Sequence, residues 1–236
     1  MSVPALNGSV YTEYVDPAVT QKTISFTVGA DLVNSILVVT FAGLSNDLSS
    51  ATFNGKSLTV VHPSEDSWFY EQFAYIVAPD AGTHDLVLNL PSSRFNVSIQ
   101  VYTGVNQTTP IPQSVGGYSG TSPMTLNITT TVDDSLLFLF EQGGDPTHTV
   151  GTGQTQLWNY TGGYCTTGSY KAAGTAGAKS MYVTHIEDGN VGGIVFALAP
   201  FVITTSIKSV AGVAYASIAK IVGVAIASVK SVCGLS

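Results

Sequence analysis

The apolar and polar positions along the chain predict a protein built from β-strands. Two near-continuous apolar runs, Ile36–Phe41 and Leu136–Phe140, each follow a serine and are rich in β-branched or aromatic residues. Such runs are too short for a typical helix and are typical of strands buried on both faces. A second group of residues recurs at a similar spacing, with Tyr75, Ala78, Ala81 and Gly82 returning as Tyr170, Ala173, Ala176 and Gly177. The repetition predicts two related β-halves closed around one core, with the two apolar runs at its centre.

Shorter apolar or alternating stretches predict further strands on both sides of these runs. The dipeptide Asn54-Gly55 lies between Ala51–Phe53 and Leu58–Val61 and predicts a hairpin, because both residues readily take the positive φ angles of a type I′ turn. The other predicted strands are Val10–Tyr14, Thr23–Val28, Trp68–Val77, Asp85–Leu90, Asn96–Val105, Met124–Ile128, Gln154–Tyr160, Tyr164–Ala172, Lys179–Ile186 and Gly193–Pro200. Many short strands separated by turn signals predict an all-β fold, an antiparallel, jelly-roll-like β-sandwich of two related halves.

The last part of the chain has a different pattern, which predicts a β-sandwich domain over residues 1–201 and a docking or oligomerisation tail over residues 202–236. An eleven-residue period in the tail brings glycine back at Gly212, Gly223 and Gly234. So few repeats cannot bury their own apolar faces. We therefore expect the tail to dock on copies of itself or on another protein. Its apolar positions are Ile207, Val210, Val213, Ile218, Ile221, Val224, Val229 and Val232.

Two conformations are compatible with the tail. An eleven-residue period is that of a helix with a hendecad stripe. The recurring glycine and the excess of Val, Ile and Ser instead favour two strands, Val213–Ile221 and Val224–Val232. A closed homo-oligomer, with a trimer as the first expectation, would bury the apolar positions. A membrane span is disfavoured, because Lys220 lies in the middle of the apolar stretch and Ser, Ala and Gly dilute it.

Charged residues are scarce, at 10% of the chain against about 25% in an ordinary soluble domain. A surface of Thr, Ser, Asn and Gly suits a protein packed against neighbours, and it equally suits a weakly charged β-sandwich. The net charge is −7, and all 15 acidic residues precede Phe201, whereas the tail holds Lys208, Lys220 and Lys230. The acidic body argues against nucleic acid as a partner. No secretory signal is visible, so we expect assembly inside a cell.

Several turns and strand edges resemble a known β-sandwich module. They are Thr27–Gly29, Ala51–Thr59, Ala81–His84, Tyr102–Ile111, Gly153–Gln156 and Ala176–Met181. The module is the jelly-roll-like β-sandwich of bacterial surface proteins and tailed-phage virion proteins, and the likeness covers about residues 20–200. The tail is similar to the terminal Ile-Lys-x-Val-x-Gly-Val-Ala repeats of phage structural proteins.

The resemblance implies a structural protein of a bacteriophage virion, such as a capsid decoration, a head fibre or a tail component. It would be assembled in the host cytoplasm, with other virion proteins as partners. The family brings no catalytic residue, so we expect neither an enzyme nor a cofactor. The alternative function is a carbohydrate-binding adhesin module on a phage fibre or a bacterial surface, with a cell-surface glycan as its partner.

Few side chains suggest a specific chemistry. Four aromatic residues form either a sugar-stacking face or ordinary packing within the sheets: Trp68, Tyr70, Trp158 and Tyr160. Four histidines show no metal-ligand spacing and are expected to be ordinary strand or loop residues: His62, His84, His148 and His185. Glu71 and Glu141 lie on predicted strands, and nothing else in the sequence marks them as a glycosidase pair.

Overall fold

The computed structural model describes residues 2–44, 46–63, 70–144, 147–161, 164–185 and 190–202. Among these residues there are strands and turns but no helix, which confirms the predicted all-β fold. No helix in this part of the chain could therefore cross a membrane. Residues 1–202 form one compact unit. Trp68 and the tail positions from Ile207 to Val232 lie outside the described residues, so the conformation of the tail stays a prediction.

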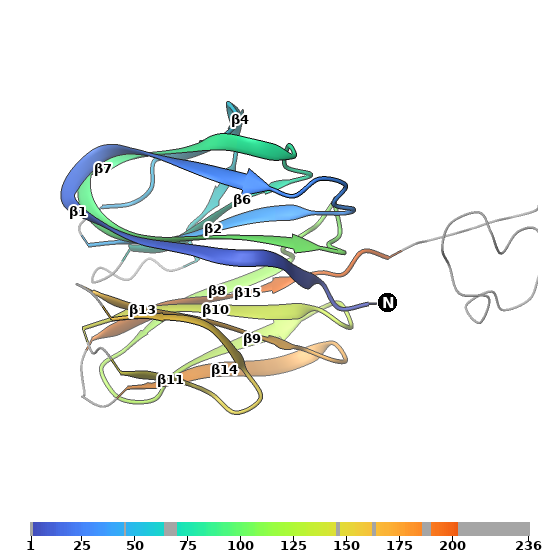
Figure 1. The fold of residues 1–236 in the computed structure, drawn as a ribbon. Coiled ribbons are helices and arrows are strands. Elements are labelled where there is room, and N and C mark those ends of the chain that lie inside the picture. Colours follow the sequence, from blue (N-terminus) through green and yellow to red (C-terminus); the bar gives the residue numbers. More distant parts are fainter. Residues whose placement is uncertain are drawn as a thin grey trace, which may run out of the picture. The chain divides into compact units, whose positions relative to one another are not determined.

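The first half of the compact unit contains seven described strands in one strongly curved sheet. They are β1 (Ala5–Val28), β2 (Ile36–Gly43), β3 (Ser50–Phe53), β4 (Lys56–Ser57), β5 (Thr59–Val61), β6 (Tyr70–Val77) and β7 (Gly82–Thr103). The order is β4-β3-β7-β2-β6-β5, and β1 pairs with β7 along almost its whole length. The paired β1 and β7 fold over together, so that this single sheet forms two layers (Figure 1).

The second half builds its two layers from separate sheets. Its strands are β8 (Gln113–Ser119), β9 (Met124–Thr130), β10 (Leu136–Gly143), β11 (His148–Val150), β12 (Thr155–Tyr160), β13 (Cys165–Ala172), β14 (Gly177–His185) and β15 (Val191–Leu198). One sheet has the order β12-β13-β10-β15-β8 and the other the order β11-β14-β9. All of the pairings are antiparallel, as expected for a jelly-roll-like sandwich.

The two halves repeat one plan, as the sequence predicts. β2 lies between β6 and β7, and β10 lies in the same way between β13 and β15. The amide of Ala78 donates to the carbonyl of Ser35 at 2.8 Å, and the amide of Ala173 donates to the carbonyl of Ser135 at the same distance. One turn hydrogen bond is therefore conserved between the halves.

Four of the strand predictions were wrong in extent. Val10–Tyr14 and Thr23–Val28 are parts of the single strand β1, and Asp85–Leu90 and most of Asn96–Val105 belong to the single strand β7, which ends at Thr103. Register shifts such as that between Val15 and Val19 let the paired strands bend without separating. The prolines and polar residues at the bends led the alternation pattern to predict breaks there. β8 and β11 were missed because they are short and rich in polar or glycine neighbours.

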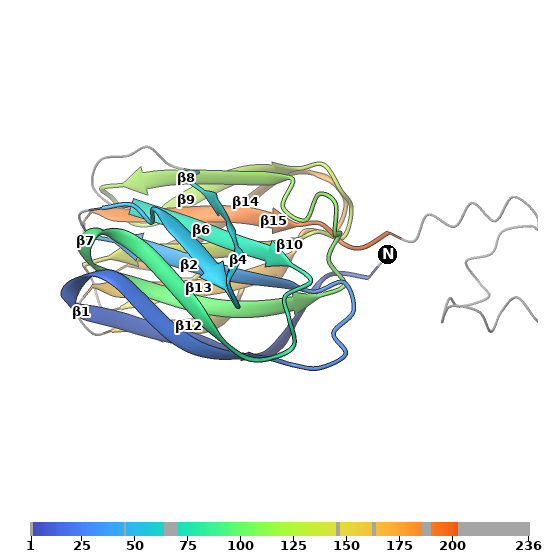
Figure 2. The ribbon, with the colours of Figure 1, turned by 90° about the horizontal axis from the view of Figure 1, so that it is seen from above.

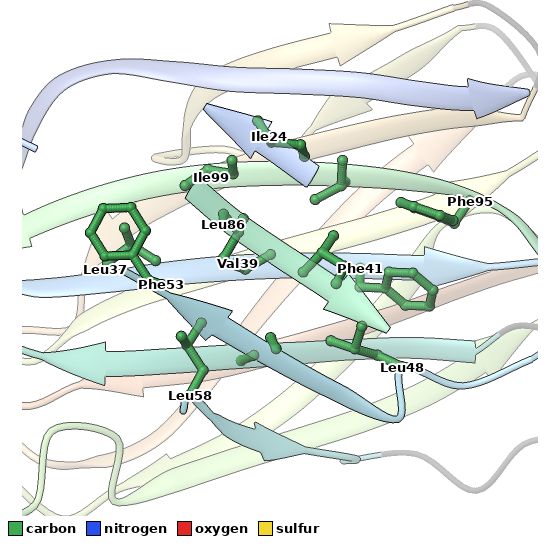
Figure 3. Packing of buried hydrophobic residues seen from close by; sticks show 14 of the residues in the cluster. Ile24, Leu37, Val39, Phe41, Leu48, Phe53, Leu58, Leu86, Phe95 and Ile99 are labelled. Carbon is green, nitrogen blue, oxygen red and sulfur yellow. The ribbon is translucent and has the colours of Figure 1, made fainter. Parts of the chain in front are cut away.

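The prediction of one shared core was also wrong, because the structure has three apolar clusters. In β2, Leu37, Val39 and Phe41 point into the core of the first half (Figure 3). Ile36 and Val38 point the other way, into a cluster between the halves. A third cluster fills the space between the two sheets of the second half. β2 and β10 are thus buried on both faces, as predicted, but they face different cores.

The cluster between the halves is rich in stacked aromatic rings. The ring centroids of Phe73 and Phe196 are 4.6 Å apart, and those of Phe138 and Phe196 are 4.9 Å apart. Since Phe73 belongs to β6 and the other two to β15 and β10, these rings join the two halves. Figure 2 shows the strands of both halves running lengthwise, with β8 and β12 at opposite margins.

The two chain ends of the compact unit leave it at the same end, which we call the terminal end. Ala5 pairs with Thr103, and the amide of Phe201 donates to the carbonyl of Gly104 at 2.7 Å. Both the start of β1 and the end of β15 lie on the right in Figure 1. The opposite end, where β2 and β10 finish at Gly43 and Gly143, is called the loop end below.

Candidate functional site

The four aromatic residues singled out by the sequence do not gather at one place. Tyr70 begins β6 in the first half, where it pairs with Gly43 and is half-buried. Trp158 and Tyr160 lie on β12 in the second half. Trp68 lies outside the described residues. The structure therefore brings only Trp158 and Tyr160 close together on one strand.

Trp158 packs against its neighbours in the second half and against the cluster between the halves. A Cβ atom added at Gly168 would lie 2.1 Å from its ring, so the indole covers this glycine. The centroid of the ring is 5.9 Å from that of Phe138 and 6.2 Å from that of Phe140. Its Nε1 donates to the Oγ1 of Thr166 at 3.4 Å. The ring of Trp158 is therefore held in place by its neighbours on β10 and β13.

Tyr160 instead meets a tyrosine that the sequence did not single out. The ring centroids of Tyr14 and Tyr160 are 6.5 Å apart with an angle of 39° between the planes. Tyr14 belongs to β1, so this contact crosses from one half to the other. A third tyrosine, Tyr164, lies in the connection from β12 to β13 and is 40% exposed. We call Tyr14, Tyr160 and Tyr164 the tyrosine seam.

The buried side chain of Asn96 holds the backbone of Tyr164 in place. Its Nδ2 donates to the carbonyl of Tyr164 at 3.0 Å and to the Oε1 of Gln142 at 3.2 Å. Asn96 is also the register partner of Tyr14 on the neighbouring strand β1. One amide from β7 thus fixes the backbone of Tyr164 beside the strand that carries Tyr14.

An exposed ion pair lies next to the tyrosine seam. The Nε of Arg94 is 3.1 Å from the Oδ1 of Asp16, and both side chains are about half exposed. Asp16 lies two residues after Tyr14, and Arg94 lies two residues before Asn96. The ion pair lies where the pairing of β1 with β7 shifts after Val15, so it directly follows the paired positions Tyr14 and Asn96. The site therefore combines three aromatic rings with a planar donor and a planar acceptor.

A second unusual cluster is buried in the second half. The Nδ1 of His148 is 2.9 Å from the Oε2 of Glu141, and both side chains are fully buried. His185 is the register partner of His148 and is also buried. The sequence predicted ordinary strand or loop roles for these histidines and did not indicate that His148 contacts Glu141. A comparison of the two halves indicates that Glu141 is unusual, because the equivalent position in the first half is Phe41, an apolar core residue.

Glu71 and Glu141 do not share a cleft. A Cβ added at Gly192 would lie 2.2 Å from the Oε1 of Glu71, which places this carboxylate at the interface between the halves. Glu141 contacts His148 in the core of the second half. Within the described residues, no three His, Cys, Asp or Glu side chains are arranged to hold a metal ion.

A shallow polar groove lies beside the predicted hairpin turn. Asn54 and Gly55 have φ angles of +50° and +73°, which agree with the predicted type I′ turn. The groove is lined by Thr52, Asn54, Gly55, Thr83, His84, Asp85 and Val87. Next to it, hydrogen bonds from Lys56 and then Asn54 lower the pKa of Asp80. The groove has no aromatic wall, so it is a weaker candidate than the tyrosine seam.

Comparisons with protein-family models, with curated proteins and with solved structures find no match to this chain.

Proposed function

We propose that this chain is a structural protein of a bacteriophage virion, a β-sandwich displayed on the particle and held there through its C-terminal repeat. The proposal starts from the resemblance to virion modules over about residues 20–200 and from the repeat after Phe201. The role is to hold a rigid domain at a defined place, as a capsid decoration, a head fibre or a tail component.

The observation that carries the proposal is the placement of the chain ends. Both ends of the compact unit leave at the terminal end, next to Thr103 and Gly104. A domain attached through the segment after Phe201 would thus point its loop end away from the attachment. One of the three apolar clusters packs residues of both halves against each other, which supports a rigid domain.

The tail is proposed to supply the attachment. Its apolar positions cannot be buried within so few repeats, and an exposed apolar patch of this kind marks an interaction surface. Its three lysines oppose an acidic body, so neighbouring subunits attract one another. A trimer or a contact with another virion protein would bury the apolar positions.

Purified particles from the cells that make the chain test this proposal. Peptide mass spectrometry should find the chain in the particles, and cryo-electron microscopy should show a β-sandwich with its loop end outward. A chain that ends at Phe201 should be missing from the particles. Absence of the full chain from purified particles would overturn the proposal.

The second candidate function is that of a carbohydrate-binding adhesin module. The tyrosine seam is the observation that favours it, because its rings lie near the loop end and beside an exposed ion pair. Display and binding are compatible, since a displayed domain can carry a binding site at its outer end.

A further inference from the structure

We propose that the tyrosine seam, together with the Asp16–Arg94 ion pair, is a binding site for a neutral glycan. The site is formed by both halves, because Tyr14 comes from β1 while Tyr160 and Tyr164 belong to the β12–β13 hairpin. It deepens the proposed display function by giving the displayed domain a ligand.

The aromatic part of the site is already arranged for binding. Tyrosine combines a large apolar ring with little conformational freedom, and its hydroxyl keeps one end polar. The rings of Tyr14 and Tyr160 support each other at 6.5 Å. The backbone of Tyr164 is fixed by Asn96, which is itself only 2% exposed. Binding therefore requires little ordering of the Tyr14–Tyr160 pair and of the backbone that carries Tyr164, which favours affinity for a weakly interacting ligand.

The polar part of the site suits the hydroxyl groups of a sugar. The guanidinium of Arg94 supplies several N–H donors in one plane, and the carboxylate of Asp16 accepts hydrogen bonds. Because the two groups neutralise each other at 3.1 Å, the site has no net charge of its own. The apolar face of a pyranose ring can stack on the tyrosine rings, and its hydroxyl groups can hydrogen-bond with Arg94 and Asp16.

The charge of the protein selects against acidic glycans. All 15 acidic residues but only five of the eight basic residues precede Phe201, so the body carries a charge of −10. An anionic polysaccharide would be repelled by this field, and a nucleic acid would be repelled in the same way. A neutral glycan is the ligand class that fits both the composition of the site and the charge around it.

Binding of the purified full chain to an array of neutral oligosaccharides tests the proposal. The array should include oligomers of glucose, galactose, mannose, rhamnose and N-acetylglucosamine, with sialylated and uronate-containing glycans for comparison. We expect saturable binding to at least one neutral glycan. Binding confined to the acidic glycans, or no binding to any neutral glycan, would overturn the proposal.

A matched pair of tyrosine variants locates the site. Tyr164→Ala should weaken binding by about tenfold, since one aromatic ring contact is lost. Tyr118→Ala is the control, because Tyr118 is 37% exposed and lies on β8, at the opposite margin of the sheet from β12. Equal losses in the two variants would refute the assignment to the tyrosine seam.

Two further measurements separate binding from folding and from display. Arg94→Gln should weaken binding while the melting temperature stays within the error of the wild-type value, because the side chain is exposed. Tyr164→Ala should enter particles as well as the wild-type chain does. Particles that contain the chain but bind no neutral glycan would overturn the glycan site and leave the display function standing.

Discussion

Glu141 occupies in the second half the position that Phe41 occupies in the first. Each is the sixth residue of the central strand of its half, and each points into the core of that half. Phe41 packs on Phe95 with ring centroids 4.8 Å apart, whereas Glu141 pairs with His148 at 2.9 Å. The second half therefore holds a buried contact between a carboxylate and an imidazole where the first half holds two aromatic rings.

Removal of one partner from this pair should destabilise the protein strongly. Glu141→Gln removes the buried carboxylate that faces the imidazole of His148, and a buried polar group that loses its partner costs about 1–3 kcal/mol. Urea unfolding of the full chain measures the loss. The control is Glu13→Gln, which breaks the partly exposed Lys22–Glu13 pair and should cost less than about 1 kcal/mol. Equal costs would show that the Glu141–His148 pair is not effectively buried.

Replacement of both partners should have the opposite result. Glu141→Phe combined with His148→Leu converts the site to an apolar core like that of the first half. Replacement of both members of a buried polar pair by apolar side chains of similar shape leaves stability nearly unchanged or raises it. The unfolding midpoint in urea should equal or exceed that of the wild type. A double variant as unstable as Glu141→Gln would contradict this.

Tyr102 should make the protein sensitive to alkaline conditions. Its hydroxyl is fully buried without a hydrogen-bond partner among the described residues, and burial raises its pKa. Tyr102→Phe should stabilise the protein by about 1 kcal/mol near neutral pH, because the unsatisfied hydroxyl is removed. The folded state keeps its proton while the unfolded chain loses it above about pH 10, so the wild type loses stability as the pH rises.

Tyr11 provides the contrast to Tyr102 near neutral pH, because its hydroxyl has a hydrogen-bond partner. Its hydroxyl donates to Glu13 at 2.7 Å, and burial followed by the Glu13 hydrogen bond raises its pKa to about 12. Tyr11→Phe should therefore lower stability near neutral pH by roughly 1 kcal/mol. Urea unfolding at about pH 8 and at about pH 11 compares the two variants. A stabilising effect of Tyr11→Phe near neutral pH would contradict the hydrogen bond.

The Asn54–Gly55 turn should require glycine at position 55 because of its positive φ angle and not because of a lack of space. Gly55 has a φ of +73°, and a Cβ added there meets nothing within 4 Å. Gly55→Val should lower stability by about 1–3 kcal/mol, since a β-branched residue is strained at positive φ. Gly144→Val is the control, because a Cβ there also meets nothing within 4 Å and its φ is not positive. Equal melting temperatures for the two variants would refute the turn assignment.

The tail should control association. Sedimentation of the full chain should show an oligomer, with a trimer expected, whereas a chain that ends at Phe201 should run as a monomer or associate weakly. Circular dichroism of the shorter chain should keep the β-sheet spectrum, because the three apolar clusters lie before this point. A full chain that is monomeric and also fails to bind particles would exclude both proposed roles of the tail.

The sequence predicted the features that depend on local patterns. The central strands β2 and β10, the Asn54–Gly55 turn and the two related halves all follow from short apolar runs and from repeated residues. The continuous strands β1 and β7 could not be predicted in the same way. Their bends interrupt the alternation of apolar and polar residues, while the pairing between the strands continues through register shifts.

The candidate sites depend on contacts that are distant in the sequence. Tyr14 and Tyr160 meet only because the two halves pack together, and no local pattern indicates which faces are in contact. His148 lies close to Glu141 in the sequence, but the two belong to different sheets. The sequence marks Trp158 as an aromatic residue on a strand. It does not indicate that its ring covers Gly168 on the neighbouring strand.

The position of β15 has a mechanical consequence. A tail fixed to a particle and a ligand held at the loop end would pull on the domain along its strands. Hydrogen bonds between antiparallel strands lie perpendicular to that direction, so a lengthwise pull shears many of them at once. β15 is the last strand before the tail, and it is bonded to β10 on one side and to β8 on the other. The strand that leads to the tail therefore resists tension better than an edge strand would.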